Sequence, residues 1–217
     1  MHINTDKKAV YLHVMKTGGT SLYNMLGAPK ELLQREVQPE EKWGVYIGMH
    51  GSYSELAKNY PAEFELSKDY YKFMFVRNPW SHAMSSYFHT TSPQRFDKEN
   101  HLGSNNRRAT RDDYKNFNYY LQYLYRPQEC LTFDDPNFMY DEAYFFEDYD
   151  NEVRRLFKRF DYSDKAFGPK IVHQNKSEVN IFGAPYPKSY KYMFNQDGHD
   201  IIADKCSRYI EEFNYSF

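Results

Sequence analysis

Short apolar runs alternate with longer amphipathic stretches along this chain. The runs at 9–14, 71–76 and 143–147 are rich in aromatic and β-branched residues and are bounded by polar or glycine-containing turns. Runs of this length and composition predict buried strands. Residues 44–49 form a further strand candidate, which ends at His50.

Helices are predicted between and after these strands. The expected helices cover about 22–26, 52–59, 79–88, 114–125, 150–160 and 200–212. Ser52 and Glu55 form a capping-box pattern at the start of the second helix, and Pro79 stands where the first turn of a helix tolerates proline. Strands that alternate with helices predict an α/β fold, with a central parallel sheet flanked by helices in a single domain over residues 1–217.

Two polar stretches separate the predicted elements. Residues 30–43 have no clear periodicity, and residues 90–113 are expected to form a long surface loop. Loops of that length in compact domains are usually functional or disordered. We therefore expect residues 90–113 to be functional or disordered.

Composition narrows the class of protein. The chain has 217 residues, with 28 Lys+Arg against 30 Asp+Glu, which excludes a nucleic-acid binder that works by bulk positive charge. Mean hydropathy is low at −0.89, yet aromatic residues make up 19% of the chain. Aromatic rings are therefore expected to carry the core.

The sequence also gives indications of the cellular compartment. No apolar stretch approaches the ~18 residues of a membrane span, and the first residues have no apolar signal-peptide core. Cys130 and Cys206 show no metal-ligand or CxxC spacing, which favours two thiols in a reducing compartment over a disulfide. These features predict a cytoplasmic protein, although a secretory-pathway protein with its leader removed would share them.

Polar residues follow the predicted strands at their carboxyl ends. Lys16, His50, Arg77 and Glu147 each lie at or just past the end of a strand. Ligands of parallel α/β sheets bind at this edge. The four positions therefore predict a single site.

The segment after the first strand has the chemistry of an anion site. It consists of Lys16, Thr17, Gly18, Gly19, Thr20 and Ser21. The glycines let backbone N–H groups approach an anion, the hydroxyls add donors and Lys16 adds positive charge. The lysine precedes the glycines, unlike the nucleotide-kinase order G-x-x-x-x-G-K-[ST]. A glycine turn that serves packing remains the alternative.

Arg77 and Ser85 form a second candidate anion site. Eight residues separate them, about two helical turns, so they share no local hydrogen bond within a helix. They could meet around one anion if the chain bends at Pro79. Their spacing alone favours the alternative, in which the arginine forms an ion pair and the serine is an ordinary helix residue.

The two motifs together resemble the sulfotransferase superfamily. K-T-G-G-T-S follows the first strand and F-V-R-N-P-W-x4-S-S-Y spans a later strand end, as in the carbohydrate sulfotransferases, including the heparan 2-O-sulfotransferase-like enzymes. The resemblance implies a P-loop-like sulfotransferase fold, no metal, and 3′-phosphoadenosine 5′-phosphosulfate (PAPS) as donor. It implies that residues 16–21 bind the 5′-phosphosulfate and that Arg77 and Ser85 bind the 3′-phosphate.

Later segments extend the resemblance. Residues 144–147 are similar to a family strand that ends in glutamate, and residues 173–177 match an H-x-N-x-S pattern, in which Lys176 is an implied cofactor contact. The C-terminal residues 210–217 are similar to a closing D-x-x-x-F-x-Y-x-F pattern but lack the aspartate.

Sulfuryl transfer requires a base for the acceptor hydroxyl and a cation near the leaving phosphate. Lys16 suits the cation. The resemblance implies His50 as the base, since it stands where 2-O-sulfotransferase-like enzymes carry an H-G-H-like segment, with Gly48 in place of the first histidine. Glu55 and His173 are the competing candidates. His13, inside a strand, is expected to be a core residue.

The resemblance implies a carbohydrate acceptor, and acidic carbohydrates are among the candidates. The resemblance implies an acceptor-binding insertion at about 90–140, and the clustered Arg107, Arg108 and Arg111 fall within it. These arginines could hold carboxylates or sulfates. A solvated charged loop is the alternative. Two other functions stay open: a nucleotide or small-molecule kinase, and a non-catalytic nucleotide-binding module. The sequence does not identify the acceptor or the oligomeric state.

Overall fold

The described part of the chain falls into two compact units. A computed structural model of the protein describes residues 1–25, 52–93, 110–127, 135, 139–161 and 178–217. The first unit lies within Met1–Arg77 and Cys130–Asn175, and the second within Asn78–Glu129 and Lys176–Phe217. The predicted single domain over 1–217, with its insertion, stays a prediction.

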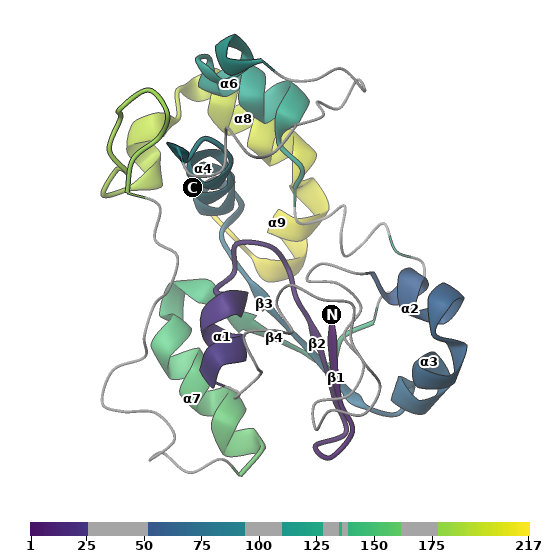
Figure 1. Cartoon of the computed structure of the whole chain (residues 1–217). Coiled ribbons are helices and arrows are strands. Elements are labelled where there is room, and N and C mark those ends of the chain that lie inside the picture. The colour runs from purple at the N-terminus through teal and green to yellow at the C-terminus, as the bar shows by residue number, and fades with distance from the viewer. Residues whose placement is uncertain (26–51, 94–109, 128–134, 136–138, 162–177) are drawn as a thin grey trace. The chain divides into compact units, whose positions relative to one another are not determined.

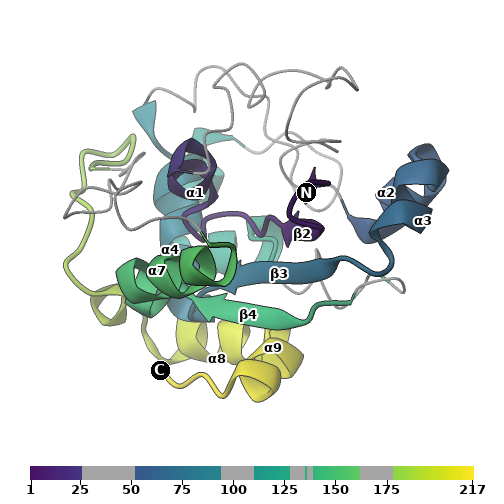
Figure 2. The same ribbon diagram turned by 90° about the horizontal axis from the view of Figure 1, so that it is seen from below.

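A mostly parallel sheet forms the centre of the first unit. Its strands, in order across the sheet, are β1 (His2–Asn4), β2 (Ala9–Leu12), β3 (Tyr71–Val76) and β4 (Glu142–Phe145). Figure 2 shows β2, β3 and β4 side by side in this order. β2, β3 and β4 run parallel, whereas β1 pairs antiparallel with β2.

The predicted α/β fold with flanking helices is thereby confirmed. Three predicted strands correspond to β2, β3 and β4. The predicted strand at 44–49 lies outside the described residues. β1 was not predicted, because its three residues are too few to show a period.

Helices of the first unit follow the strands. They are α1 (Gly19–Met25), α2 (Tyr53–Asn59), α3 (Pro61–Ser67), the short 3-10 helix η5 (Phe146–Asp148) and α7 (Tyr149–Arg159). The Ser52 hydroxyl accepts from Glu55 N–H at 3.1 Å and the Glu55 carboxylate accepts from Ser52 N–H at 2.7 Å, which confirms the capping box. Figure 1 shows α1 beside α7 and α2 beside α3.

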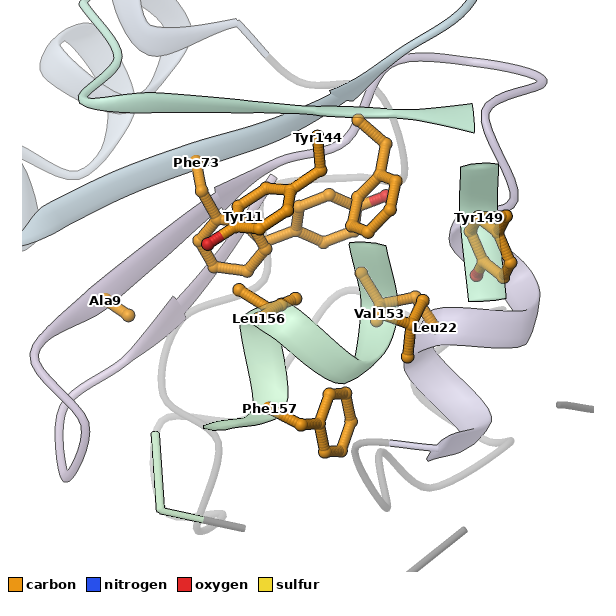
Figure 3. Close-up of a cluster of buried hydrophobic side chains, with 10 residues drawn as sticks. Ala9, Tyr11, Leu22, Phe73, Tyr144, Tyr149, Val153, Leu156 and Phe157 are labelled. Atoms are coloured by element: carbon orange, nitrogen blue, oxygen red, sulfur yellow. The ribbon is translucent and has the colours of Figure 1, made fainter. Parts of the chain in front are cut away.

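One face of the sheet and two helices enclose an aromatic core (Figure 3). Alternate strand residues point into it because side chains of a strand alternate between faces. The cluster contains Ala9, Tyr11, Leu22, Phe73, Phe75, Tyr144, Tyr149, Val153, Leu156 and Phe157. Leu22 comes from α1, and Val153 with Leu156 from α7, so the core connects the strands to the segment between β2 and α1.

The second unit is helical in its described part. It contains α4 (Pro79–Thr90), η2 (Arg111–Tyr114), α6 (Phe117–Tyr119), the π-helical turn η3 (Tyr120–Leu124), η7 (Tyr190–Met193), α8 (Gln196–Lys205) and α9 (Ser207–Phe213). α4 is buried along most of its length and packs on α8. Trp80 of α4 donates through its indole N–H to the His199 carbonyl at 3.2 Å.

Two predicted helices are divided in this unit. The predicted helix at 114–125 consists of α6 and η3, and the C-terminal one breaks into α8 and α9 at Cys206. Cys206 has φ −118° and ψ 24°, outside helical values, while Ile202, Cys206 and Tyr209 all remain buried. Within the described residues, no helix is both long and apolar enough to cross a membrane.

Candidate active site

The segment between β2 and α1 turns sharply at two left-handed residues. Lys16 has φ +61° and Gly18 has φ +84°. Glycine adopts this conformation without a steric penalty, but for lysine it costs on the order of 1 kcal/mol, and such strain clusters at ligand and catalytic sites. We refer to Lys16–Ser21 as the anion loop.

A buried threonine stabilises the turn from inside. Thr17 is fully buried, and its hydroxyl donates to the Val14 carbonyl at 2.7 Å. This bond closes the chain on itself directly before the glycines. The Thr17 hydroxyl therefore supports the loop backbone in this structure.

Arg77 joins the second motif to the first. It follows β3, and its Nη1 donates to the Lys16 carbonyl at 3.0 Å, across 61 positions of sequence. The guanidinium lies 4.3 Å from the centre of the Phe146 ring, and Arg77 is 8% exposed. Because β2 and β3 are parallel neighbours, their carboxyl ends meet and bring the two segments together.

Close packing explains one of the loop glycines. A Cβ on Gly19 would lie 1.8 Å from Nε2 of His13, so no side chain fits there. His13 is 8% exposed and stacks on Tyr11 at 5.4 Å. The histidine expected in the core is thus buried, with its ring directly against the anion loop.

The remaining loop residues begin α1. Thr20 is half-buried and Ser21 is 4% exposed. The first helical hydrogen bond runs from Leu22 N–H to the Gly18 carbonyl at 3.1 Å. The backbone N–H groups of the residues before Leu22 lie in the first turn of α1, where no carbonyl of the helix accepts a hydrogen bond from them.

Several predicted site residues lie outside the described part of the chain. These are His50, Arg107, Arg108, His173 and Lys176. Their assignments stay predictions.

The other predicted residues have defined surroundings. Ser85 lies on α4 in the second unit and is 8% exposed. Arg111, in the same unit, donates through Nη2 to the Ile181 carbonyl at 2.8 Å. Glu147 is exposed in η5, two residues past β4. The Glu55 carboxylate accepts the Ser52 N–H in the capping box, which gives this candidate base a structural role.

Sequence reasoning missed one residue at the loop. Tyr149, the first residue of α7, donates its hydroxyl hydrogen bond to the Gly18 carbonyl at 2.8 Å. Its position directly before an amphipathic helix was visible in the sequence. The contact itself was not, because it joins residues 131 positions apart.

Comparison with known proteins identifies the family of this chain. The chain matches no curated protein and no solved structure. Its residues 1–163 match the family described as the sulfotransferase family. That span includes the anion loop, β3 with Arg77, and β4 with α7. The chain therefore belongs to the sulfotransferase family.

Proposed function

We propose that this protein transfers a sulfuryl group from PAPS to a hydroxyl of a carbohydrate, in the manner of the heparan 2-O-sulfotransferase-like enzymes. Family membership supports sulfuryl transfer in general and disfavours the kinase alternative. The observation that carries the proposal is the hydrogen bond from Arg77 to the Lys16 carbonyl. It joins the two segments to which the resemblance assigns the two ends of the donor.

The chemistry of the loop fits an anionic donor. Lys16 supplies positive charge, and hydrogen-bond donors at the 5′ end come from the backbone N–H groups of Thr17 to Ser21 and from the hydroxyls of Thr20 and Ser21. The Thr17 hydroxyl donates to the Val14 carbonyl instead. Arg77 supplies a guanidinium, which suits the oxygens of the 3′-phosphate. Ser85 and Lys176 remain further candidates from the resemblance. When bound, PAPS supplies a sulfuryl group activated by its bond to phosphate.

Each catalytic role requires a different property. Lys16 is proposed to offset the negative charge that builds on the leaving phosphate oxygen. His50 is proposed to take the proton of the acceptor hydroxyl as a neutral imidazole. His173 is the competing base. The capping role of Glu55 makes this third candidate less suitable.

An acidic carbohydrate is the proposed acceptor class. Arg107, Arg108 and Arg111 are its candidate contacts, because guanidinium groups bind carboxylates and sulfates in bidentate fashion. Arg111 already donates to the Ile181 carbonyl and lies 5.7 Å from the centre of the Phe182 ring. Acceptor binding by Arg111 would therefore share or replace that bond.

A cytoplasmic location also stays a prediction.

A transfer assay tests the proposal. The protein is incubated with PAPS labelled in the sulfuryl group and with a panel of polysaccharides, glycolipids and small alcohols. We expect label on a carbohydrate, and a Lys16→Ala variant with kcat lower by ~10²–10³-fold. His50→Ala and His173→Ala in the same assay identify the base. Nucleotide binding without transfer to any acceptor would support the non-catalytic module instead.

A further inference from the structure

Tyr149 touches the anion loop at its second left-handed residue (Figure 3). Its hydroxyl donates to the Gly18 carbonyl at 2.8 Å. A Cβ on Gly18 would lie 2.5 Å from Cε2 and 2.8 Å from Cζ of the tyrosine. The ring therefore lies directly against the Gly18 α-carbon, and the contact requires glycine at that position.

The tyrosine is itself rigidly held. It is 4% exposed, and its ring centre lies 5.3 Å from that of Phe75 and 5.5 Å from that of Phe146. Burial raises the pKa of the Tyr149 hydroxyl above its ordinary value. The phenol thus stays protonated at neutral pH and remains a hydrogen-bond donor.

Arg77 and Tyr149 hold alternate carbonyls of the loop. The Arg77 guanidinium lies over the Phe146 ring, and that ring packs at a tilt against Tyr149, so the two loop contacts are joined by a chain of packed side chains. Arg77, at one end of this chain, binds the Lys16 carbonyl, and Tyr149, at the other, binds the Gly18 carbonyl.

The orientation of these carbonyls determines the orientation of the following N–H groups. In a trans peptide the C=O and the next N–H point to opposite sides. A Lys16 carbonyl held by Arg77 turns the Thr17 N–H away from the guanidinium. The Gly18 carbonyl accepts from both the Tyr149 hydroxyl and the Leu22 N–H, and this orientation turns the Gly19 N–H away from the phenol.

We propose that Tyr149 is a positioning residue for the sulfuryl donor: its hydroxyl holds the Gly18–Gly19 peptide so that the Gly19 N–H faces the 5′-phosphosulfate. This inference rests on the proposed function of the loop as the donor site. Tyr149 acts through the loop backbone and touches no reacting atom. Without its hydroxyl, a smaller fraction of molecules has the loop in the binding conformation, and the apparent Kd rises in inverse proportion to that fraction.

Two Tyr→Phe variants separate positioning from packing. Tyr149→Phe keeps the ring and removes the hydrogen bond to the loop. Tyr144→Phe is the matched control: Tyr144 belongs to the same core cluster, its ring lies 5.4 Å from Phe75, and its hydroxyl bonds to Tyr71 at 3.0 Å and to Glu142 at 3.2 Å. Both variants lose a buried hydroxyl, but the hydroxyl of Tyr144 bonds to residues of β3 and β4.

Two measurements are made on the full chain. Calorimetric titration gives the Kd of 3′-phosphoadenosine 5′-phosphate, and amide hydrogen exchange follows residues 16–21 without nucleotide. We expect Tyr149→Phe to weaken binding by roughly 3- to 10-fold, the effect of one ordinary hydrogen bond, and to speed exchange in the loop. Tyr144→Phe should change neither.

The outcomes distinguish the two proposals. Unchanged affinity and unchanged loop exchange in Tyr149→Phe would overturn the positioning role. Equal effects of both variants would also overturn it, because they would indicate general loosening of the core. If the wild type binds no nucleotide, the proposed function fails, whereas loop exchange still decides whether Tyr149 holds the loop.

Discussion

At the scale of single residues, side-chain hydrogen bonds to backbone carbonyls stabilise the anion loop. Arg77 donates to the Lys16 carbonyl and Tyr149 to the Gly18 carbonyl, while Thr17 donates to the Val14 carbonyl before the loop. The glycines and hydroxyl side chains of this segment were sufficient to predict an anion-binding loop. The positive φ at Lys16 and its contact with Arg77 were not predictable, because the contact joins residues 61 positions apart and no local signal marks lysine for a left-handed backbone.

The contact between Gly18 and Tyr149 can be tested by comparing Gly18 with Gly183, which also has a left-handed backbone. Gly18→Ala places a Cβ 2.5 Å from the Tyr149 ring at φ +84°, whereas Gly183→Ala introduces a Cβ at φ +78° with nothing within 4 Å. Backbone strain of roughly 1–3 kcal/mol applies to both variants. Gly18→Ala should therefore lose clearly more stability in urea denaturation. Equal losses would mean that the Gly18–Tyr149 contact relaxes at no cost.

At the scale of elements, local pattern determined what could be foreseen. β3 and the capping box of α2 were predicted because a continuous apolar run and a Ser-x-x-Glu spacing are local signals. α3 was missed, since it is a short polar helix that begins at Pro61. The break at Cys206 was missed because the apolar stripe continues through it.

The capping box also decides between two roles of Glu55. Glutamine serves in a capping box as well as glutamate, but it cannot accept a proton as a general base. Glu55→Gln should therefore keep both thermal stability and transfer activity, while Ser52→Ala should cost about 1 kcal/mol of stability. A stable Glu55→Gln protein without transfer activity would make Glu55 the base.

β1 carries a titratable residue that links stability to pH. His2 is 4% exposed, and burial lowers its pKa from 6.5 to about 4. Between these values the unfolded chain binds a proton that the folded chain does not. Stability contributed by the neutral imidazole is therefore present above pH 6.5 and is lost as pH falls toward 4, by on the order of 3 kcal/mol.

Denaturation of wild type and His2→Gln above and within this pH window tests the link. The variant cannot take up the proton, so its stability should fall less steeply with decreasing pH. Parallel pH profiles for the two proteins would assign the acid sensitivity to other groups.

At the scale of the whole molecule, family membership and the parallel sheet support one donor site at the carboxyl ends of β2 and β3. Motif order along the chain was sufficient to predict the family and these two segments. The acceptor was not predictable in the same way. The proposed acceptor contacts Arg107 and Arg108 supply charge but belong to no sequence motif.

One variant can separate the observed contact of Arg77 with the loop from its proposed contact with the nucleotide. Arg77→Ala removes both the bond to the Lys16 carbonyl and the proposed contact with the 3′-phosphate. A loosened loop weakens all nucleotides alike, whereas loss of the 3′ contact weakens only those with a 3′-phosphate. The ratio of two affinities therefore isolates the second role.

The most direct test of the donor site is the ratio of Kd for adenosine 5′-phosphate to Kd for 3′-phosphoadenosine 5′-phosphate, measured by calorimetric titration of the wild type and Arg77→Ala. A charge-assisted contact predicts roughly 10- to 100-fold tighter binding of the bisphosphate to the wild type. Arg77→Ala should bring the ratio close to one. Equal affinity of the wild type for the two nucleotides would contradict a PAPS-dependent sulfotransferase.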